Sequence, residues 1–321
     1  MAELLDVRNL TVEYRTSRGR IKAVNDVSFS LSKGSTLGLV GESGSGKSTL
    51  GHAIMRLVRP PGLISSGSIN FDGVDLLSLN EEEIRRVRGK RIAMVFQDPM
   101  SSLSPVKKVG DHYVEYIREH RPETSREDAL RIAKEIFEDL GIERSRLEDY
   151  PHQFSGGMRQ RVMIGLALAL RPQLIIADEP TTALDVLVEA QILELLKELK
   201  RKYSVSLMLI THNMGVVAET TDVIAVMYAG KLMEVSPTMK LYSDPKNPYT
   251  KALLQSIPNI LVDDQVLRSI PGSPPDMASL PPGCPFSPRC PYVFDLCRKE
   301  DPRLIAVDGD SYVACHLYGD G

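Results

Sequence analysis

The chain opens with two segments in which apolar and polar residues alternate, residues 4–14 and 24–31. Alternation puts one side of a strand in a core and the other toward water, so we expect antiparallel strands there. Further along, the alternation gives way to short apolar runs, at Thr36–Val40, Arg91–Phe96, Leu174–Ala177, Leu207–Ile210 and Asp222–Tyr228. Such runs, separated by helical segments, predict an α/β fold with a mainly parallel sheet covered by helices on both faces.

Apolar residues at helical spacing mark the segments between these runs. Residues 125–140 predict an amphipathic helix that ends at Gly141, and Val186–Lys202 predicts another. Asn80 precedes three glutamates, which is typical of a helix start, because asparagine caps the helix and acids suit its first turn. From about residue 100 to residue 158 the pattern is mostly helical, so we expect a helical subdomain there.

A glycine-rich loop follows the first apolar run and precedes a helical segment. The segment Gly41–Thr49 matches G-x-x-x-x-G-K-[ST] at every fixed position. In this context the backbone N–H groups surround phosphate oxygens, with a helix N-terminus behind them. We expect Lys47 to reach the β- and γ-phosphates of ATP and Ser48 to bind Mg²⁺. The residues expected to hold the nucleotide here are Ser43, Gly44, Ser45, Gly46, Lys47, Ser48 and Thr49.

The apolar run Leu174–Ala177 ends in two carboxylates, Asp178 and Glu179. Carboxylates at the end of a buried strand cost free energy unless they have a task, although a solvated acidic turn is the ordinary alternative. In a chain with a P-loop, Asp178 fits coordination of Mg²⁺, usually through water. Glu179 fits the base that orients and polarises the water attacking the γ-phosphate.

A second glycine-rich helix start lies at Phe154–Arg161. Ser155 can cap this helix, and the two glycines after it let the first backbone N–H groups approach an anion closely. A P-loop and a distant second phosphate site in one chain suggest that ATP is held between two subunits.

These residues resemble the ABC-type ATPases, whose signature reads Ser-Gly-Gly-x-x-Gln. In that family the signature of one subunit completes the ATP site of its partner, which implies this role for Ser155, Gly156, Gly157 and Gln160. The resemblance also implies that Gln97 contacts the metal and water, and that Asp185 lies at the dimer interface. It implies that His212 contacts the γ-phosphate and that Tyr14 stacks on adenine. A polar strand end or a half-buried strand tyrosine would look the same in sequence.

Composition narrows the remaining classes of function. Of 321 residues 42% are hydrophobic, enough for a substantial core, and the formal net charge of −3 comes without a long basic run. Charge therefore does not indicate a nucleic-acid partner. No apolar stretch approaches the roughly 18 residues that span a bilayer, and the N-terminus lacks a basic n-region. We expect a soluble cytoplasmic chain that other subunits bring to a membrane.

The sequence changes character after about residue 236, so we divide it into an ATPase domain, 1–236, and an extension, 237–321. Eight prolines between Pro271 and Pro291 predict irregular structure. The extension holds all four cysteines of the chain, Cys284, Cys290, Cys297 and Cys315. A reducing cytoplasm disfavours disulfides, and a four-thiolate metal site would fix an otherwise loose segment. The intervening gaps of five, six and seventeen residues differ from the close pairs usual for zinc.

Three segments sharpen the resemblance: Gly283–Pro291, Asn247–Leu254 and Tyr150–Gln153. They look like ATP-binding subunits of oligopeptide and dipeptide ABC importers, some of which hold a [4Fe–4S] cluster at these four cysteines. For this chain the resemblance implies such a cluster, with zinc or no metal as the alternatives.

The same resemblance implies hydrolysis of ATP coupled to import of oligopeptides or dipeptides. The implied partners are a second homologous ATPase, in a heterodimer or a homodimer, two transmembrane permease subunits and, indirectly, an extracellular solute-binding protein. The implied place is the cytoplasmic face of a prokaryotic membrane. An oligosaccharide or nickel importer could use a nearly identical ATPase. A non-transport ABC ATPase is the remaining alternative, although the long coiled-coil insertion, tandem ATPase or basic surface of that class is not visible.

Overall fold

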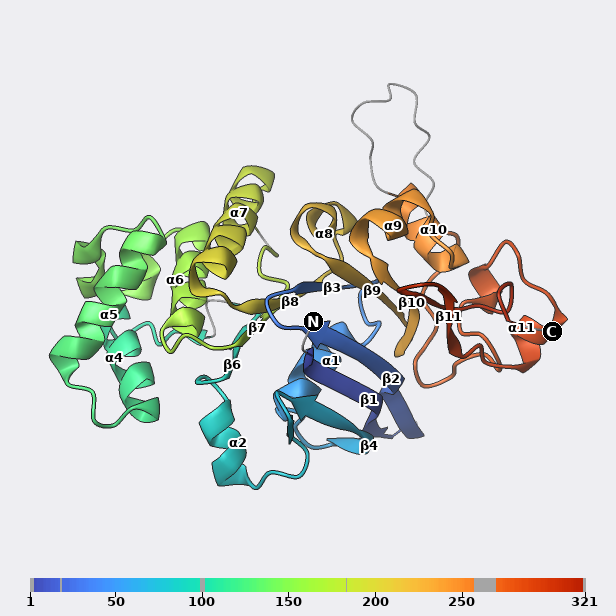
Figure 1. Cartoon of the computed structure of the whole chain (residues 1–321), viewed down its shortest axis with the longest axis horizontal. Helices are drawn as coiled ribbons and strands as arrows, with labels where there is room; N and C mark the ends of the chain where they lie inside the picture. The colour runs from blue at the N-terminus through green and yellow to red at the C-terminus, as the bar shows by residue number, and fades with distance from the viewer. Residues whose placement is uncertain (1–2, 18, 99–101, 183, 257–269, 320–321) are drawn as a thin grey trace. The chain divides into compact units, whose positions relative to one another are not determined.

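The computed structural model describes residues 3–17, 19–98, 102–182, 184–256 and 270–319. The chain forms two compact units, one of residues 1–78 and 209–321, the other of residues 79–208. Figure 1 shows both units, with helices and strands labelled where there is room. The first unit therefore joins the N-terminal strands and the P-loop to the C-terminal part of the chain, although these segments are far apart in sequence.

The first unit contains an antiparallel sheet with the strand order β2-β1-β4-β5. In it β1 (Glu3–Thr16) pairs antiparallel with β2 (Gly19–Ser32) and with β4 (Gly62–Phe71), while β4 also pairs with β5 (Val74–Asp75). Apolar side chains of β1 lie in the core. The antiparallel strands expected from the alternating pattern are thus confirmed.

A second sheet in this unit has the strand order β11-β12-β10-β9-β3. The entirely buried β3 (Thr36–Val40) lies parallel to β9 (Val223–Tyr228), and β10 (Lys231–Pro237) turns back antiparallel to β9. The hairpin of β11 (Leu304–Asp308) and β12 (Ser311–Ala314) follows, with β12 paired to β10. The helices of the unit are α1 (Lys47–Ile54), α8 (Met214–Thr220), α9 (Thr238–Ser243), α10 (Pro248–Gln255), the 3₁₀ turn η3 (Ser287–Arg289) and α11 (Asp295–Lys299).

The C-terminal extension is more regular than the sequence suggested. The helices α9 and α10 precede its prolines, and the hairpin β11-β12 follows them as a part of the sheet. Among the described residues, the proline-dense stretch from Pro271 to Pro291 contains only one short 3₁₀ turn, because proline lacks the N–H that helices and ladders need. Residues 257–269, which the division at residue 236 assigns to the extension, lie outside the described residues.

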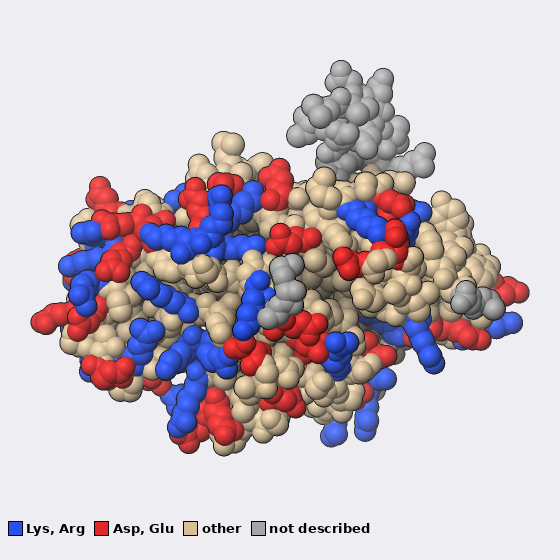
Figure 2. Space-filling model, viewed as in Figure 1, with Lys and Arg blue, Asp and Glu red and all other residues tan. Residues whose placement is uncertain are grey.

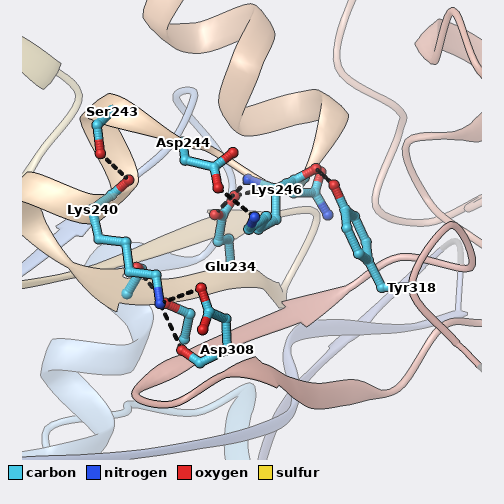
Figure 3. A network of polar contacts seen from close by, with 10 residues as sticks. Glu234, Lys240, Ser243, Asp244, Lys246, Asp308 and Tyr318 are labelled. Atoms are coloured by element: carbon cyan, nitrogen blue, oxygen red, sulfur yellow. Dashed lines mark hydrogen bonds and ion pairs between the residues drawn. The ribbon is translucent and has the colours of Figure 1, made fainter.

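A buried carboxylate of β10, that of Glu234, forms hydrogen bonds with the backbone of the extension (Figure 3). Glu234 is 1% exposed and accepts the backbone N–H groups of Lys246 and Asn247, at 2.8 Å each. Burial raises the pKa of Glu234, while these two N–H donors oppose the rise. The Lys240 ammonium bonds Asp308 at 2.7 Å, so the same region also contacts the hairpin. These contacts hold the start of α10 in a fixed place.

The second unit is mostly helical around a pair of buried strands. The strands β6 (Ile92–Val95) and β7 (Leu174–Asp178) are parallel, and Asn80 caps α2 in a full capping box, as expected. The unit also contains α2 (Glu81–Val87), α4 (Val109–His120), α5 (Arg126–Asp139), η1 (Arg144–Glu148), η2 (Pro151–Gln153), α6 (Gly156–Leu168) and α7 (Val186–Tyr203). The strand β8 (Ser206–Thr211) is divided between the two units. The predicted α/β fold with parallel strands is confirmed.

The described surface mixes charges of both signs. Figure 2 shows acidic and basic side chains interspersed over one face of the molecule. No helix among the described residues combines the length and the apolar character needed to cross a membrane.

Candidate active site

The P-loop has the strand-loop-helix setting that its sequence predicts. It leaves the buried strand β3 and enters α1 at Lys47, with Gly46 as the N-cap. Glycine is required at Gly41, where φ is 151°, because a Cβ there would lie 2.0 Å from the carbonyl oxygen of Met227. The N–H of Gly230 donates to the carbonyl oxygen of Ser45 at 2.9 Å, a distance typical of such hydrogen bonds. The turn after β9 thus supports the loop.

The Lys47 ammonium lies inside the loop. It donates to the carbonyl oxygens of Gly41 at 2.8 Å and Glu42 at 2.9 Å, and the side chain is 4% exposed. A buried ammonium held by backbone carbonyls is fixed in position at the mouth of a helix N-terminus. This arrangement suits an anion with several negative charges.

Two other residues that are predicted to contact the nucleotide, Tyr14 and His212, lie in the first unit, as the P-loop does. Tyr14 lies half-buried on β1, with its ring against Gly62. His212 is exposed directly after β8, where the adjacent Thr211 hydroxyl accepts the N–H of Asn213. The stacking of Tyr14 on adenine and the contact of His212 with the γ-phosphate remain predictions.

The carboxylates of the second unit lie at the end of β7. Asp178 is buried, 3% exposed, and Glu179 follows at φ 45°, in the left-handed region that non-glycine residues seldom occupy. The Gln97 amide donates to Glu179 Oε2 at 3.0 Å. The structure thus brings together two residues that the sequence places 82 positions apart.

Sequence reasoning missed a third member of this group. The Thr182 hydroxyl donates to the same Oε2 of Glu179 at 2.8 Å. Two donors on one oxygen fix the orientation of the carboxylate. The nearness of Thr182 to Glu179 along the chain was the available signal, because a hydroxyl three residues after a carboxylate in a turn can reach back to it.

The signature segment opens α6 as predicted. Ser155 is the N-cap, and its hydroxyl accepts the N–H of Met158 at 3.3 Å. A Cβ on Gly157 would lie 2.5 Å from Val188 of α7, so this glycine permits close packing of the two helices. Gln160 is 2% exposed, and its Nε2 has no hydrogen-bond partner among the described residues. Gly156 lies in the first turn.

Asp185 has a local role that the sequence did not indicate. Its Oδ1 accepts the N–H of Val188 at 2.9 Å, so it caps α7. The next two residues, Val186 and Leu187, are 78% and 77% exposed. The start of α7 therefore presents an apolar surface, while the interface role of Asp185 remains a prediction.

The four cysteines of the extension line one pocket, together with Phe286 and His316 among others. Burial raises the pKa of the Cys284 thiol to about 11, and the neighbouring cysteines add to the rise. Burial also raises the pKa values of Cys290 and Cys315. Among the described residues, however, no group of three or more His, Cys, Asp or Glu side chains is arranged to hold a metal ion. The four expected thiolate ligands therefore share one pocket, but they are not arranged to hold a single metal ion.

Comparison with known proteins decides the family. The model of the ABC transporter family matches residues 24–182, and that of the oligopeptide/dipeptide transporter C-terminal region matches residues 233–297. The oligopeptide transport ATP-binding protein OppD of Bacillus subtilis is 46% identical over 321 residues, covering 99% of this chain and 89% of that protein. This chain belongs to the family of ABC transporter ATP-binding proteins. It is therefore an ABC-type ATPase.

Further relatives agree with this assignment. The dipeptide transport ATP-binding protein DppD of Bacillus subtilis is 47% identical over 320 residues, with 99% of this chain and 95% of that protein covered. Among solved structures, the dimeric ATP-binding cassette MJ0796 bound to ADP and Pi is 28% identical, with a TM-score of 0.66. That match covers 73% of this chain and 99% of the other. The family resemblance inferred from the motifs is confirmed.

Proposed function

We propose that this chain is the ATP-hydrolysing subunit that powers import of oligopeptides or dipeptides through a membrane transporter. The observation that carries the proposal is near-full-length similarity to proteins named for oligopeptide and dipeptide transport. The match to the oligopeptide/dipeptide transporter C-terminal region adds a second, separate segment to that similarity.

Hydrolysis proceeds by in-line attack of water on the γ-phosphate, and the protein contributes positioning and electrostatic stabilisation. Lys47 and the loop Ser43–Thr49 hold the phosphates, and Tyr14 stacks on adenine. Glu179, oriented by Gln97 and Thr182, polarises the water, while His212 contacts the γ-phosphate. When bound, Mg²⁺ neutralises charge on the phosphates, and the residues that would hold it are Ser48, Gln97 and Asp178.

The working form is a dimer with two shared ATP sites. Ser155, Gly156, Gly157, Gln160 and Asp185 contact the ATP held by the partner. Three observations support this assignment: the helix N-terminus at Ser155 suits an anion, the start of α7 exposes Val186 and Leu187, and a related cassette is described as dimeric. The partner is a second homologous ATPase, identical or similar to this chain.

The dimer drives two transmembrane permease subunits from the cytoplasmic face of the membrane, and an extracellular binding protein delivers the solute. Closure on ATP and reopening after hydrolysis move the permease between its two orientations. A transporter of oligosaccharides or nickel would need the same ATPase chemistry, because the ATPase does not touch the solute.

The four cysteines hold a [4Fe–4S] cluster, with a zinc ion as the alternative. In support, all four thiols of the chain line one pocket. Cysteine thiolates are the usual ligands of such clusters, and each binds a different iron, so they lie farther apart than the ligands of one ion. Ligation needs deprotonated thiols, so assembly of the cluster releases protons.

The identity of the transported solute is tested by binding assays on the extracellular binding protein, which selects the solute. The extracellular binding protein expressed with this transporter should bind short peptides in a calorimetric titration and should not bind oligosaccharides or Ni²⁺. Binding of a sugar or nickel alone would replace the peptide assignment and leave the ATPase assignment in place.

A further inference from the structure

The P-loop is tied to the C-terminal extension by an ion pair. Glu42 occupies a variable position of the loop, directly after Gly41. Its carboxylate accepts two hydrogen bonds from the guanidinium of Arg289, at 2.7 Å from Nη1 to Oε2 and 3.0 Å from Nη2 to Oε1. The two residues are 247 positions apart. A bidentate pair of this kind fixes orientation as well as distance.

The pair lies mostly away from water. The Arg289 side chain is 6% exposed and that of Glu42 is 23% exposed. The guanidinium lies 5.8 Å from the ring centre of Tyr228 and 6.0 Å from that of Phe286. Its Nε donates to the carbonyl of Pro271 at 2.8 Å, and Nη1 also donates to the Tyr228 hydroxyl at 3.2 Å. Few other orientations would satisfy so many donors, so Arg289 is a rigid partner for Glu42.

A second contact holds the backbone of the same residue. The N–H of Glu42 donates to the hydroxyl oxygen of Tyr249 at 2.9 Å, and Tyr249 is fully buried in α10. The Tyr249 ring packs against Tyr228 and Phe286, with ring centres 4.6 Å and 5.2 Å away. Both the side chain and the backbone of Glu42 are thus fixed by one cluster around Arg289.

Glu42 also contacts Lys47, the lysine of the P-loop that is expected to bind phosphate. The Lys47 ammonium donates to the carbonyl oxygen of Glu42 at 2.9 Å as well as to that of Gly41. A rotation of the Glu42 peptide would move this carbonyl and the adjacent backbone N–H groups of the loop. Arg289 therefore acts on the nucleotide pocket through Glu42, at the residue that neighbours the ammonium.

We propose that Arg289 is a positioning residue for ATP, which holds Glu42 so that the P-loop is preorganised for the phosphates. The C-terminal extension then forms part of the ATP-binding apparatus of this chain. The inference rests on nucleotide binding by the P-loop and is independent of the transported solute and of any ligand at the cysteines. Preorganisation of a binding loop by supporting contacts acts on affinity, because the cost of ordering the loop is met before the ligand arrives.

The test measures ATP affinity of the isolated chain by calorimetry for Arg289→Gln, Glu42→Gln and the double variant. Each single change should weaken ATP binding by about tenfold, the lower end of the effect known for residues that orient the ligands of a metal ion. The double variant should lose about the same factor as either single change, because the two residues act as one unit. The double variant also leaves no buried charge unpaired, so it should fold even if a single variant does not.

Two further variants complete the experiment. Arg289→Lys keeps a charge near Glu42 and loses the bidentate geometry, so it should recover part of the affinity. Arg298→Gln is the matched control, since Arg298 is an exposed arginine of the same extension, and its affinity should equal that of the wild type. The kcat of the ATPase at saturating ATP should change less than twofold in the Arg289 variants, while the KM for ATP rises.

Wild-type affinity in the folded double variant would overturn the proposal, and so would losses that multiply from the single variants to the double. Failure of nucleotide binding by the P-loop would give a different result, because the wild-type chain itself would then bind no ATP in the same titration. Failure of the peptide assignment alone would leave every ATP affinity in this experiment unchanged.

Discussion

At the residue scale, the geometry around Glu179 supports its assignment as the base. Its backbone lies in the left-handed region at φ 45°, and its Oε2 accepts hydrogen bonds from Gln97 and Thr182. An unfavourable backbone angle costs free energy of about 1 kcal/mol and persists where the surrounding contacts fix it. This carboxylate is therefore held in one orientation at the end of β7.

We predict that Glu179→Gln abolishes hydrolysis and retains ATP binding. The amide keeps the size of the side chain and cannot accept a proton from water, while Lys47 and the P-loop still hold the phosphates. Steady-state ATPase activity should fall at least about 100-fold, as expected when a general base is lost. Calorimetric affinity for ATP should stay within a small factor of the wild type.

The exposed Glu198 of α7 provides a matched control for that change. Glu198→Gln removes the same charge away from β7 and should leave turnover unchanged. Near-normal turnover in Glu179→Gln would remove Glu179 from the catalytic role.

At the element scale, α6 and α7 both begin with a side-chain cap, from Ser155 and Asp185. Gly157 lets the two helices approach, since a Cβ there would contact Val188. The signature and the exposed start of α7 are therefore presented by one packed pair of helices. A partner subunit would contact both of them together.

We predict that Ser155→Arg leaves ATP binding to the isolated chain intact and destroys ATP hydrolysis by the assembled transporter. Loss of the cap costs about 1 kcal/mol, too little to unfold the unit, whereas the long charged side chain obstructs the helix N-terminus. The measurement compares ATP affinity of the chain with ATPase activity of the complex.

The variant Ser155→Ala separates the two effects, because it removes the hydroxyl without adding bulk, so it should lower the complex's activity less than Ser155→Arg does. A collapse of ATP affinity in isolated Ser155→Arg would mean that the two-subunit site is the wrong arrangement.

Local patterns predicted most elements of this fold. The capping asparagine Asn80, the amphipathic helix that begins after Ser125 and the buried run at β7 all depend on neighbours within a few residues. The pairing of β12 with β10 depends on residues more than 70 positions apart, and the prolines between them suggested an irregular tail. Sequence periodicity carries no information on such pairings.

At the scale of the whole molecule, the C-terminal extension and the N-terminal strands belong to one compact unit. The motifs located the P-loop, Asp178, Glu179 and the signature, because each is a contiguous segment. The contact of Arg289 with Glu42 could not be predicted in this way, since 247 residues separate the pair and neither stands at a fixed motif position. The pocket that the four cysteines share likewise depends on the tertiary fold.

We predict that the protein purified without oxygen contains about four irons and four sulfides per chain and is brown. Changing each ligand in turn to serine should remove the colour and the iron; the ligands are Cys284, Cys290, Cys297 and Cys315. The chain should still bind ATP, because the P-loop follows the buried strand β3, and any loss of affinity should not exceed the loss in Arg289→Gln. Anaerobic metal analysis and absorption spectra give the readout.

Met277→Leu is the control for loss of a sulfur atom in the same extension, and it should keep its iron. Stoichiometric zinc without iron would contradict the cluster and retain the four-thiolate site. Absence of both metals from the anaerobic protein would contradict the metal site as a whole.

The central claim is that ATP hydrolysis by this chain powers peptide import. The most direct measurement is uptake of a radiolabelled short peptide into proteoliposomes that contain the complete transporter, with its binding protein and ATP on the appropriate sides. Uptake should require ATP, proceed with the wild-type chain and fall to background with Glu179→Gln. Peptide uptake that continues at the wild-type rate with Glu179→Gln, or ATP hydrolysis without any peptide uptake by the wild type, would contradict the account.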